Sequence, residues 1–323
     1  VMGALFFKDT VCNGIQQLEE SNKKIGEKQQ TFLNALIGAE MYYKLVAKGA
    51  IVLDGDGYVV KITNDSLSSA EDKQLAFDIA HLESLPNLTE IRLYNTGVSG
   101  DIAHLESLPK LTMIGLGNTG VTGNIAHLES LPKLTYINLW KTGVTGNIEH
   151  LKSLKNLTGI VCGGTGVTGN IEHLEWLPHL TEINLRDTGV SGNIEHLKSL
   201  KNLFVIDLGS TDVSGDILHL ESLLNLTVIN LRDTGVSGNI AHLESLKNLN
   251  LIVLSWTGVT GNIEHLKSLP NLTEIWLYET SVTGNIEHLE SLPDLTVIYL
   301  SNTGVSGDKE AFEGSRTWAL CDL

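Results

Sequence analysis

A 23-residue pattern fills most of this chain. Residues 81–103 read HLESLPNLTEIRLYNTGVSGDIA, and the leading histidine returns every 23 residues from His104 to His288. Ten copies occupy residues 81–310. A fixed period between about 20 and 50 residues indicates a solenoid, in which each copy forms one coil and packs only against its neighbours. This repetition constrains the fold more strongly than composition or any local motif does.

Each copy carries apolar residues at positions that predict one short strand and one short helical turn. Ile91 and Leu93 are two residues apart, as on one face of a strand. Leu82 and Leu85 are three residues apart, as on one face of a helical turn. A single copy cannot bury these side chains, whereas stacked copies share one continuous core. The sequence therefore predicts a solenoid with a parallel sheet.

Three other recurring positions have expected structural roles. Gly97 and Gly100 are expected to hold backbone angles that a Cβ atom would penalise. Thr96 is Thr in all ten copies, and its hydroxyl is expected to accept from one backbone amide and donate to the next copy. A column of these hydroxyls would then satisfy backbone groups between the coils.

The pattern L-x-x-L-x-x-L-x-x-I-x-L-x-x-T-x-V-x-G-x-I, from Leu82 to Ile102, resembles the leucine-rich-repeat family. Its V-x-G-x-I ending resembles the plant-type subclass, and repeats this uniform are similar to those abundant in unicellular algae. Two positions depart from the plant type: Thr96 stands where Asn is usual, and Ala103 stands where Pro is usual. The resemblance implies an α/β solenoid that curves as a right-handed superhelix, with the parallel β-sheet on its concave face.

The repeats and their flanks divide the chain into four predicted parts. Residues 54–57, DGDG, supply the turn of a β-hairpin before the repeats. In the second hairpin strand, Val60 and Ile62 are expected to occupy the positions of Ile91 and Leu93. The parts are an N-terminal amphipathic helical segment at 1–50, an N-terminal cap of hairpin and short helix at 51–80, the ten repeats at 81–310, and a C-terminal cap at 311–323.

The N-terminal segment has the apolar spacing of a long amphipathic helix, with steps of three and four residues around two polar gaps. One interpretation is that its later half packs on the open first coil. The other is that its earlier half binds a helix of a partner protein, and the two are compatible. The predicted partner-binding side chains of this helix are Ile15, Leu18, Ile25, Phe32 and Leu36.

On the concave face that the resemblance implies, one column of exposed positions alternates between large and small side chains. It begins with Tyr94, Gly117, Trp140 and Gly163 and keeps this alternation through the ten copies. One interpretation is a duplicated double repeat, or the packing of a large side chain over its Gly neighbour. The other is a row of shallow slots that bind an extended protein segment, because Tyr, Trp and Arg often dominate the binding energy of interfaces.

The predicted partner-binding residues of this face include a C-terminal aromatic group and a central mixed-charge group. The aromatic group consists of Trp256, Trp276, Tyr278 and Tyr299, and it is costly to leave in water unless a partner covers it. The charged group can instead pair within itself on a solvated face; its members are Arg186, Asp187, Asp207, Arg232 and Asp233. The full predicted set is Tyr94, Tyr136, Trp140, Arg186, Asp187, Arg232, Asp233, Trp256, Trp276, Tyr278 and Tyr299.

Charge and motifs exclude several classes of function. The net charge of −16 argues against a nucleic-acid partner. No apolar stretch reaches the ~18 residues of a membrane span, although peripheral association with a membrane complex stays open. No Walker loop, GxSxG or HExxH motif occurs, so we expect neither enzymatic activity nor a cofactor. Stacked histidines can bind a metal or sense pH, but their identical surroundings favour a structural or solvated role, and we predict no metal site.

These observations predict a non-enzymatic protein-binding or scaffold solenoid that uses its concave face and its N-terminal helix. One alternative is a constitutive accessory subunit of a large assembly, such as a photosystem or another membrane complex of an algal plastid. A second alternative is an extracellular, receptor-like ligand-binding domain. The compartment stays open between plastid lumen, plastid stroma and the extracellular space, and the start at Val1 suggests a processed N-terminus.

Overall fold

The structure is a computed structural model that describes residues 48–55, 57–65, 75–314 and 320–322. The chain divides into two compact units, unit 1 at residues 1–144 and unit 2 at residues 145–323, and each is described by itself. The predicted N-terminal helix, with its partner-binding side chains, lies outside the described residues. None of the helices that the structure describes combines the length and the apolar character that a membrane crossing requires.

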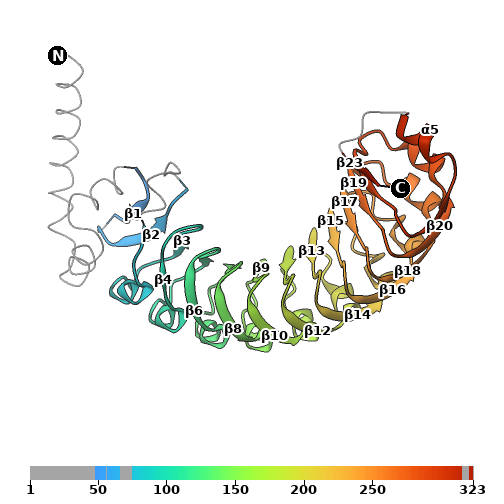
Figure 1. Cartoon of the computed structure of the whole chain (residues 1–323). Coiled ribbons are helices and arrows are strands. Elements are labelled where there is room, and N and C mark those ends of the chain that lie inside the picture. The colour runs from blue at the N-terminus through green and yellow to red at the C-terminus, as the bar shows by residue number, and fades with distance from the viewer. Residues whose placement is uncertain (1–47, 56, 66–74, 315–319, 323) are drawn as a thin grey trace, which may run out of the picture. The chain divides into compact units, whose positions relative to one another are not determined.

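Unit 1 contains a hairpin followed by short parallel strands (Figure 1). The strands of its larger sheet are β1 (Ile51–Leu53), β2 (Val59–Thr63), β3 (Glu90–Arg92), β5 (Met113–Gly115) and β7 (Tyr136–Asn138). β1 pairs antiparallel with β2, which confirms the predicted hairpin, and the later strands pair in parallel. A second sheet pairs β4 (Ser99–Asp101) with β6 (Gly120–Asn124).

The predicted register of the hairpin with the first repeat is wrong by two residues. Ile62, rather than Val60, pairs with Ile91. The reason is that Ile62 is buried, whereas Val60 is only partly buried and uses its carbonyl to accept from the Thr89 amide and hydroxyl. The hairpin therefore continues the backbone ladder of the repeats and so joins their sheet.

Unit 2 repeats the same arrangement, with two parallel sheets. The larger sheet contains β9 (Gly159–Val161), β11 (Glu182–Asn184), β13 (Val205–Asp207), β15 (Val228–Asn230), β17 (Leu251–Val253), β19 (Glu274–Trp276), β21 (Val297–Tyr299) and β23 (Leu320–Asp322). The second sheet contains β8 (Gly143–Asn147), which starts at the end of unit 1, then β10 (Gly166–Asn170), β12 (Gly189–Asn193), β14 (Asp212–Asp216), β16 (Gly235–Asn239), β18 (Gly258–Asn262), β20 (Ser281–Asn285) and β22 (Gly304–Ser306). The sequence predicts the larger sheet but not the second one.

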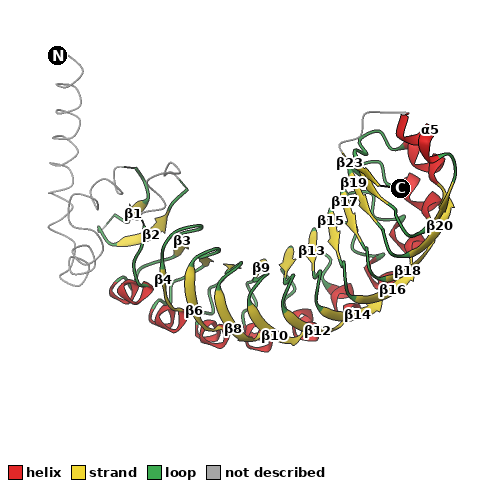
Figure 2. Ribbon diagram, viewed as in Figure 1, coloured by secondary structure: helices red, strands yellow, loops and turns green. Residues whose placement is uncertain are grey.

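The short helical turns are 3₁₀-helices, and within unit 2 they lie on the side of the stack away from the larger sheet (Figure 2). Ile79 and Leu82 in η1, and Leu85 directly after it, follow one another in steps of three and are fully buried, which fits the three residues per turn of this helix. In unit 1 the helices are η1 (Ile79–Ser84), η2 (Ile102–Ser107) and η3 (Ile125–Ser130). In unit 2 they are η4 (Ile148–Ser153), η5 (Ile171–Trp176), η6 (Ile194–Ser199), η7 (Ile217–Leu220), η8 (Ile240–Leu243), η9 (Ile263–Ser268) and η10 (Ile286–Ser291), followed by α5 (Lys309–Gly314).

The core is the set of Leu, Ile and Val columns that the repeat predicts. Ile91, Leu93 and Val98 have no exposed surface, and their counterparts in the following coils are buried as well. At the end of the stack, Phe312 in α5 is only 1 % exposed and stands at a repeat position that otherwise carries Leu. A larger aromatic side chain therefore covers the last apolar layer there.

The expected strain at glycine is confirmed at Gly100 and wrong at Gly97. Gly100 has φ +111°, and an added Cβ would overlap the Asp78 carboxylate, whose Oδ1 caps η1 by accepting from the Ala80 amide. Gly97 has no positive φ, and it is small because Ala76 lies against it. The left-handed residue of this turn is instead Asn95, with φ 56°.

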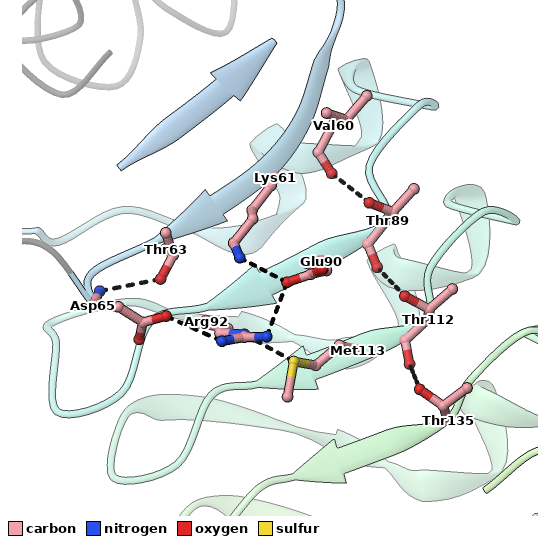
Figure 3. A network of polar contacts seen from close by, with 10 residues as sticks. All are labelled: Val60, Lys61, Thr63, Asp65, Thr89, Glu90, Arg92, Thr112, Met113 and Thr135. Carbon is pink, nitrogen blue, oxygen red and sulfur yellow. Dashed lines mark hydrogen bonds and ion pairs between the residues drawn. The ribbon is translucent and has the colours of Figure 1, made fainter. Parts of the chain in front are cut away.

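The expected role of the Thr96 column is also corrected. Thr96 Oγ1 donates to the Leu93 carbonyl in its own coil at 2.8 Å, which closes the turn rather than joining two coils. A different threonine joins the coils, as Figure 3 shows: Thr112 Oγ1 donates to the Thr89 carbonyl, and Thr135 Oγ1 donates to the Thr112 carbonyl, each at 2.9 Å. These bonds add a side-chain ladder to the backbone ladder of unit 1.

Two glycines of β16 make a matched test of this geometry. Gly238→Ala is expected to destabilise the protein by roughly 1–3 kcal/mol, because Gly238 has φ +115° and an added Cβ would overlap the Asp216 cap. Gly235→Ala is expected to have a smaller effect, because its Cβ would lie 3.3 Å from Ser214 Cβ at an ordinary backbone angle. Chemical denaturation of the two full-length variants measures the difference, and equal losses would contradict this account.

Candidate functional site

The larger sheet of unit 2 exposes three columns of side chains. In the coil of β11 these are Glu182 at the first strand residue, Asn184 at the third, and Arg186 two residues later. Figure 1 shows this sheet on the inner side of the curved stack within unit 2. We call its solvent-facing side the inner surface of unit 2. Because the interior of each coil is nearly invariant, this surface is one of the regions where the copies differ most.

An aromatic cluster occupies the C-terminal end of the inner surface. The rings of Trp276 and Tyr299 lie 4.5 Å apart between centroids, and Tyr278 meets Tyr299 edge-on at 6.3 Å. These three rings come from neighbouring coils, on and just after β19 and β21. Such ring pairs add to the apolar area that they bury. The structure thus brings together three of the four aromatic residues predicted to gather here.

Arg232 joins this cluster from the other side. Its guanidinium lies 5.8 Å from the centre of the Tyr278 ring, a distance at which a cation and a ring attract each other. Ser255 stands between them in the same column, and its small side chain leaves the space that Arg232 crosses. The alternation of large and small residues therefore lets side chains of alternate coils meet. We call Arg232, Trp276, Tyr278 and Tyr299 the aromatic cluster.

Trp256, the fourth predicted aromatic residue, lies beside this cluster without a ring contact to any described residue. It follows β17 in a left-handed conformation, with φ 59°, and is 54 % exposed. Most other coils place Asn, Asp, Ser, Lys or Glu at this turn, and Asn and Asp are the side chains that adopt the conformation most readily. An exposed tryptophan there has no folding advantage that the structure shows.

The predicted mixed-charge group is divided in the structure. Arg186 Nε pairs with Asp187 Oδ2 of the same turn at 3.1 Å, and both side chains are about half exposed. Arg232 has no carboxylate partner among the described residues and faces Tyr278 instead. Asp233 lines a separate hollow of about 310 Å³ together with Thr211 and Ser214. The central charges therefore do not form one ion-pair network.

Asp207, between these arginines, is the most unusual acid of the inner surface. Asn230 Nδ2 donates to its Oδ1 at 2.8 Å, and Asn184 Nδ2 donates to its Oδ2 at 3.3 Å. Burial raises the pKa of the Asp207 carboxyl above its ordinary value of 3.8, while the Gly209 amide, Arg186 and Asn230 oppose that rise. The three side chains form a polar strip across β11, β13 and β15.

The predicted residues of unit 1 are placed on its own larger sheet. Tyr94 packs over Gly115, where an added Cβ would overlap the phenol ring, so the geometry there favours packing. Trp140 is 38 % exposed and carries the Lys141 ammonium 4.3 Å from its ring centre. Tyr136 is half-buried at the first residue of β7.

A polar network precedes these residues on the same sheet (Figure 3). Glu90 Oε2 pairs with Lys61 at 3.0 Å and with Arg92 at 3.1 Å. Arg92 also reaches Asp65 at 3.2 Å and directs Nε at the Met113 sulfur at 2.9 Å. Because these side chains are partly exposed and already paired, the network fits structural support better than a reactive site.

The prediction missed an apolar strip at the start of the strands in unit 2. Val205, Val228 and Leu251 are register partners in β13, β15 and β17, where several other coils carry Glu, Tyr or Met. Phe204, which directly precedes β13, is 41 % exposed. A signal was present in the sequence, since Phe204 replaces a Thr that most copies keep. The strip adds apolar area to the inner surface next to the aromatic cluster.

The histidine column faces carboxylates rather than a metal site. His242 Nδ1 lies 3.2 Å from Glu221 of the preceding coil, and His265 Nδ1 lies 2.9 Å from Glu244. The described residues include no group of three or more His, Cys, Asp or Glu side chains that could hold a metal ion. The column therefore acts with the glutamates as a polar ladder along the helical side.

No protein-family model matches the chain, and no curated protein sequence matches it. Solved structures do. The Arabidopsis receptor kinase HAESA ectodomain, in complex with an N-terminally extended IDA peptide hormone, matches 85 % of this chain and 47 % of that chain at 20 % identity, with a TM-score of 0.71. The plant peptide hormone receptor RGFR1, in complex with RGF2, matches 76 % and 41 % at 24 % identity, with a TM-score of 0.66.

An internalin of Listeria monocytogenes matches 82 % of this chain and 86 % of that chain at 18 % identity, with a TM-score of 0.54. The chain thus spans less than half the length of the plant receptor chains that it matches. At these identities the likeness shows the fold. Together with the parallel sheets and the short helices, it makes this chain a leucine-rich-repeat solenoid, as the sequence predicts.

Asp207→Asn tests the buried carboxyl. Because the folded state raises the pKa of Asp207 above its unfolded value of 3.8, ionisation opposes folding above the folded pKa, and this penalty disappears as the pH falls to the unfolded value. The stability of Asp207→Asn relative to the wild type is therefore expected to be greatest near neutral pH and to decrease with acidification. Denaturation midpoints measured from about pH 7 to pH 4 check this, and a gap that widens on acidification would refute it.

Proposed function

We propose that this chain is a non-enzymatic binding protein whose inner surface in unit 2 holds an extended segment of a partner protein. The aromatic cluster is the observation that carries this proposal. Three rings and a guanidinium form one contiguous group on the face of a rigid sheet, and Trp256 stands exposed beside them. Tyr, Trp and Arg residues in such groups supply much of the binding energy at protein interfaces.

The fold supports an elongated ligand over a compact one. The strands of the larger sheet run side by side in register, so successive coils present equivalent positions about 4.8 Å apart. An extended segment that crosses the coils meets the aromatic cluster, then the polar strip of Asn184, Asp207 and Asn230. The apolar strip of Val205, Val228 and Leu251 runs alongside. Two of the structural neighbours are plant receptor structures in complex with peptide hormones.

We include the other predicted contact residues in this proposal, although fewer observations support them. Arg186, Asp187 and Asp233 lie on or beside the inner surface, and Tyr94, Tyr136 and Trp140 belong to the sheet of unit 1. The N-terminal contacts rest on the sequence pattern alone. They are Ile15, Leu18, Ile25, Phe32 and Leu36.

Two alternatives predict different behaviour of the purified protein. A constitutive subunit of a large assembly is recovered with its neighbours at near one-to-one ratio, whereas a solitary, stable monomer speaks against that role. A receptor-like extracellular domain is expected to carry carbohydrate at exposed sequons. At one of these, Asn225, the side-chain amide already donates to the Lys201 carbonyl at 2.9 Å. This contact gives no support to that alternative.

The double variant Trp276→Asn, Tyr278→Ser tests the proposal. Both new residues occur at the same positions in other coils, as Asn184, Asn230, Ser255 and Ser301, so the fold is expected to persist. Loss of the cluster is expected to weaken binding of the native partner roughly tenfold or more. The measurement is titration of the partner recovered with the wild-type protein from its native source.

Lys267→Glu is the matched control, because it changes the helical side to the residue that most copies carry. This variant is expected to keep the wild-type affinity. A partner that binds the double variant as tightly as the wild type would show that the inner surface of unit 2 is not its binding site.

A further inference from the structure

Trp176 is the most exposed large apolar side chain on the helical side of unit 2 among the described residues. It ends η5 and is 57 % exposed. The other nine copies carry Ser at this position. Six of these serines, including Ser130 and Ser291, donate to the carbonyl of the histidine three residues earlier. Tryptophan therefore gives up a local hydrogen bond and exposes apolar area, and nothing in the core requires it.

Two lysines flank Trp176 because the histidine–glutamate ladder is interrupted there. In seven copies the position of Glu83 is Glu, and at least five of these glutamates contact the histidine of the next coil, as Glu175 contacts His196 at 3.0 Å. Lys152 and Lys198 replace this Glu in the coils before and after Trp176. Neither lysine makes a hydrogen bond or ion pair with any described residue, so both ammonium groups are available to a ligand.

A third lysine holds the indole in place. Lys155 Nζ donates to the Trp176 carbonyl at 3.1 Å and lies 5.6 Å from the ring centre. A lysine ammonium has three donors, so this contact leaves others for a ligand. Beside the indole lies an open hollow of about 640 Å³, lined by residues of η4 and η5, including Lys152, His173 and Trp176, and by Lys155 in the turn after η4.

From these contacts we propose that Trp176, Lys152, Lys155 and Lys198 bind an acidic segment of a partner protein, one that places an apolar side chain between carboxylates. We call these four residues the outer tryptophan site. The lysines supply charge complementarity at two coils that flank the indole, and the indole with its hollow accepts the apolar side chain. On a chain with a net charge of −16, these three lysines gather positive charge around an exposed tryptophan.

The same hollow argues against a membrane surface as the occupant. Glu172 and Glu175 line it together with the lysines, and a sheet of anionic headgroups would meet both acids at once. A single protein segment can instead direct its carboxylates to the lysines and leave the glutamates in solvent. The binding of anionic lipid is therefore an alternative outcome of the test rather than part of the proposal.

The test compares the full chain with a variant that removes the site by restoring the residues of the other copies. Trp176→Ser, Lys152→Glu and Lys198→Glu each introduce the commonest residue of that position, so the fold is expected to be retained or strengthened. The probe is a display library of random 12-residue peptides, selected on the wild-type chain and depleted on the triple variant. Far-ultraviolet circular dichroism and denaturation confirm that the triple variant is folded.

The selected peptides are expected to carry Asp or Glu on both sides of an apolar or aromatic residue. Their affinity is expected to fall about tenfold or more on Trp176→Ser alone, to fall again on the lysine variants, and to weaken with salt. Peptides that do not distinguish the two chains, or that do so without acidic residues, would overturn the proposal. So would Trp176-dependent binding to vesicles of phosphatidylserine. The variant Trp276→Asn, Tyr278→Ser is expected to bind the peptides normally, which separates this site from the inner surface.

Discussion

No coil of this chain can satisfy its own backbone or bury its own apolar side chains. Leu93 donates its amide to the Gly115 carbonyl of the next coil at 2.7 Å, and Ile91 pairs in register with Ile114. Both isoleucines are fully buried because a neighbouring coil covers them. Stability is thus a property of adjacent coils, as expected for solenoids. The buried positions must repeat because each is the packing surface of the next.

The dependence of each coil on its neighbours also affects the residues that cap the 3₁₀-helices, although a cap is a local feature. The residue that caps a 3₁₀-helix can also touch a glycine of the following coil, as it does at η5. There, Asn170 Oδ1 accepts from the Glu172 amide and stands where a Cβ on Gly192 would lie. Changing either residue alone disturbs both the cap and the contact between coils. This contact gives a physical reason for the Asp or Asn and the Gly that recur at these two positions in the repeats.

The features that follow from period and hydrophobicity were predictable from the sequence. Leu82, Leu85, Ile91 and Leu93 are buried as expected, in short helices and parallel strands. The features that depend on how far one coil is shifted against the next were not. Thr96 was expected to link coils, but its hydroxyl closes its own turn, because reach between coils is set by backbone position rather than by residue type.

In the candidate sites too, the sequence pattern predicts which residues lie in neighbouring columns, but it does not predict which of their side chains come into contact. The sequence identifies Trp276, Tyr278 and Tyr299 as a group, since their columns are adjacent. It does not show that Trp256 makes no contact with these rings, because the direction of its side chain is set by the backbone of a left-handed turn rather than by residue type. The sequence analysis also missed the apolar strip of Val228 and Leu251, because these residues become neighbours only through the strand register.

The shared core keeps the copies of this repeat similar. A residue that differs from the common one therefore points to a function only where core packing does not require the difference. Trp256 and Trp176 both meet this condition: each replaces a small or polar residue, each is more than half exposed, and neither fills a gap in the packing. They lie on the sheet side and on the helical side of unit 2. Because the invariant coils between them keep their positions, each surface can acquire its own partner without altering the other.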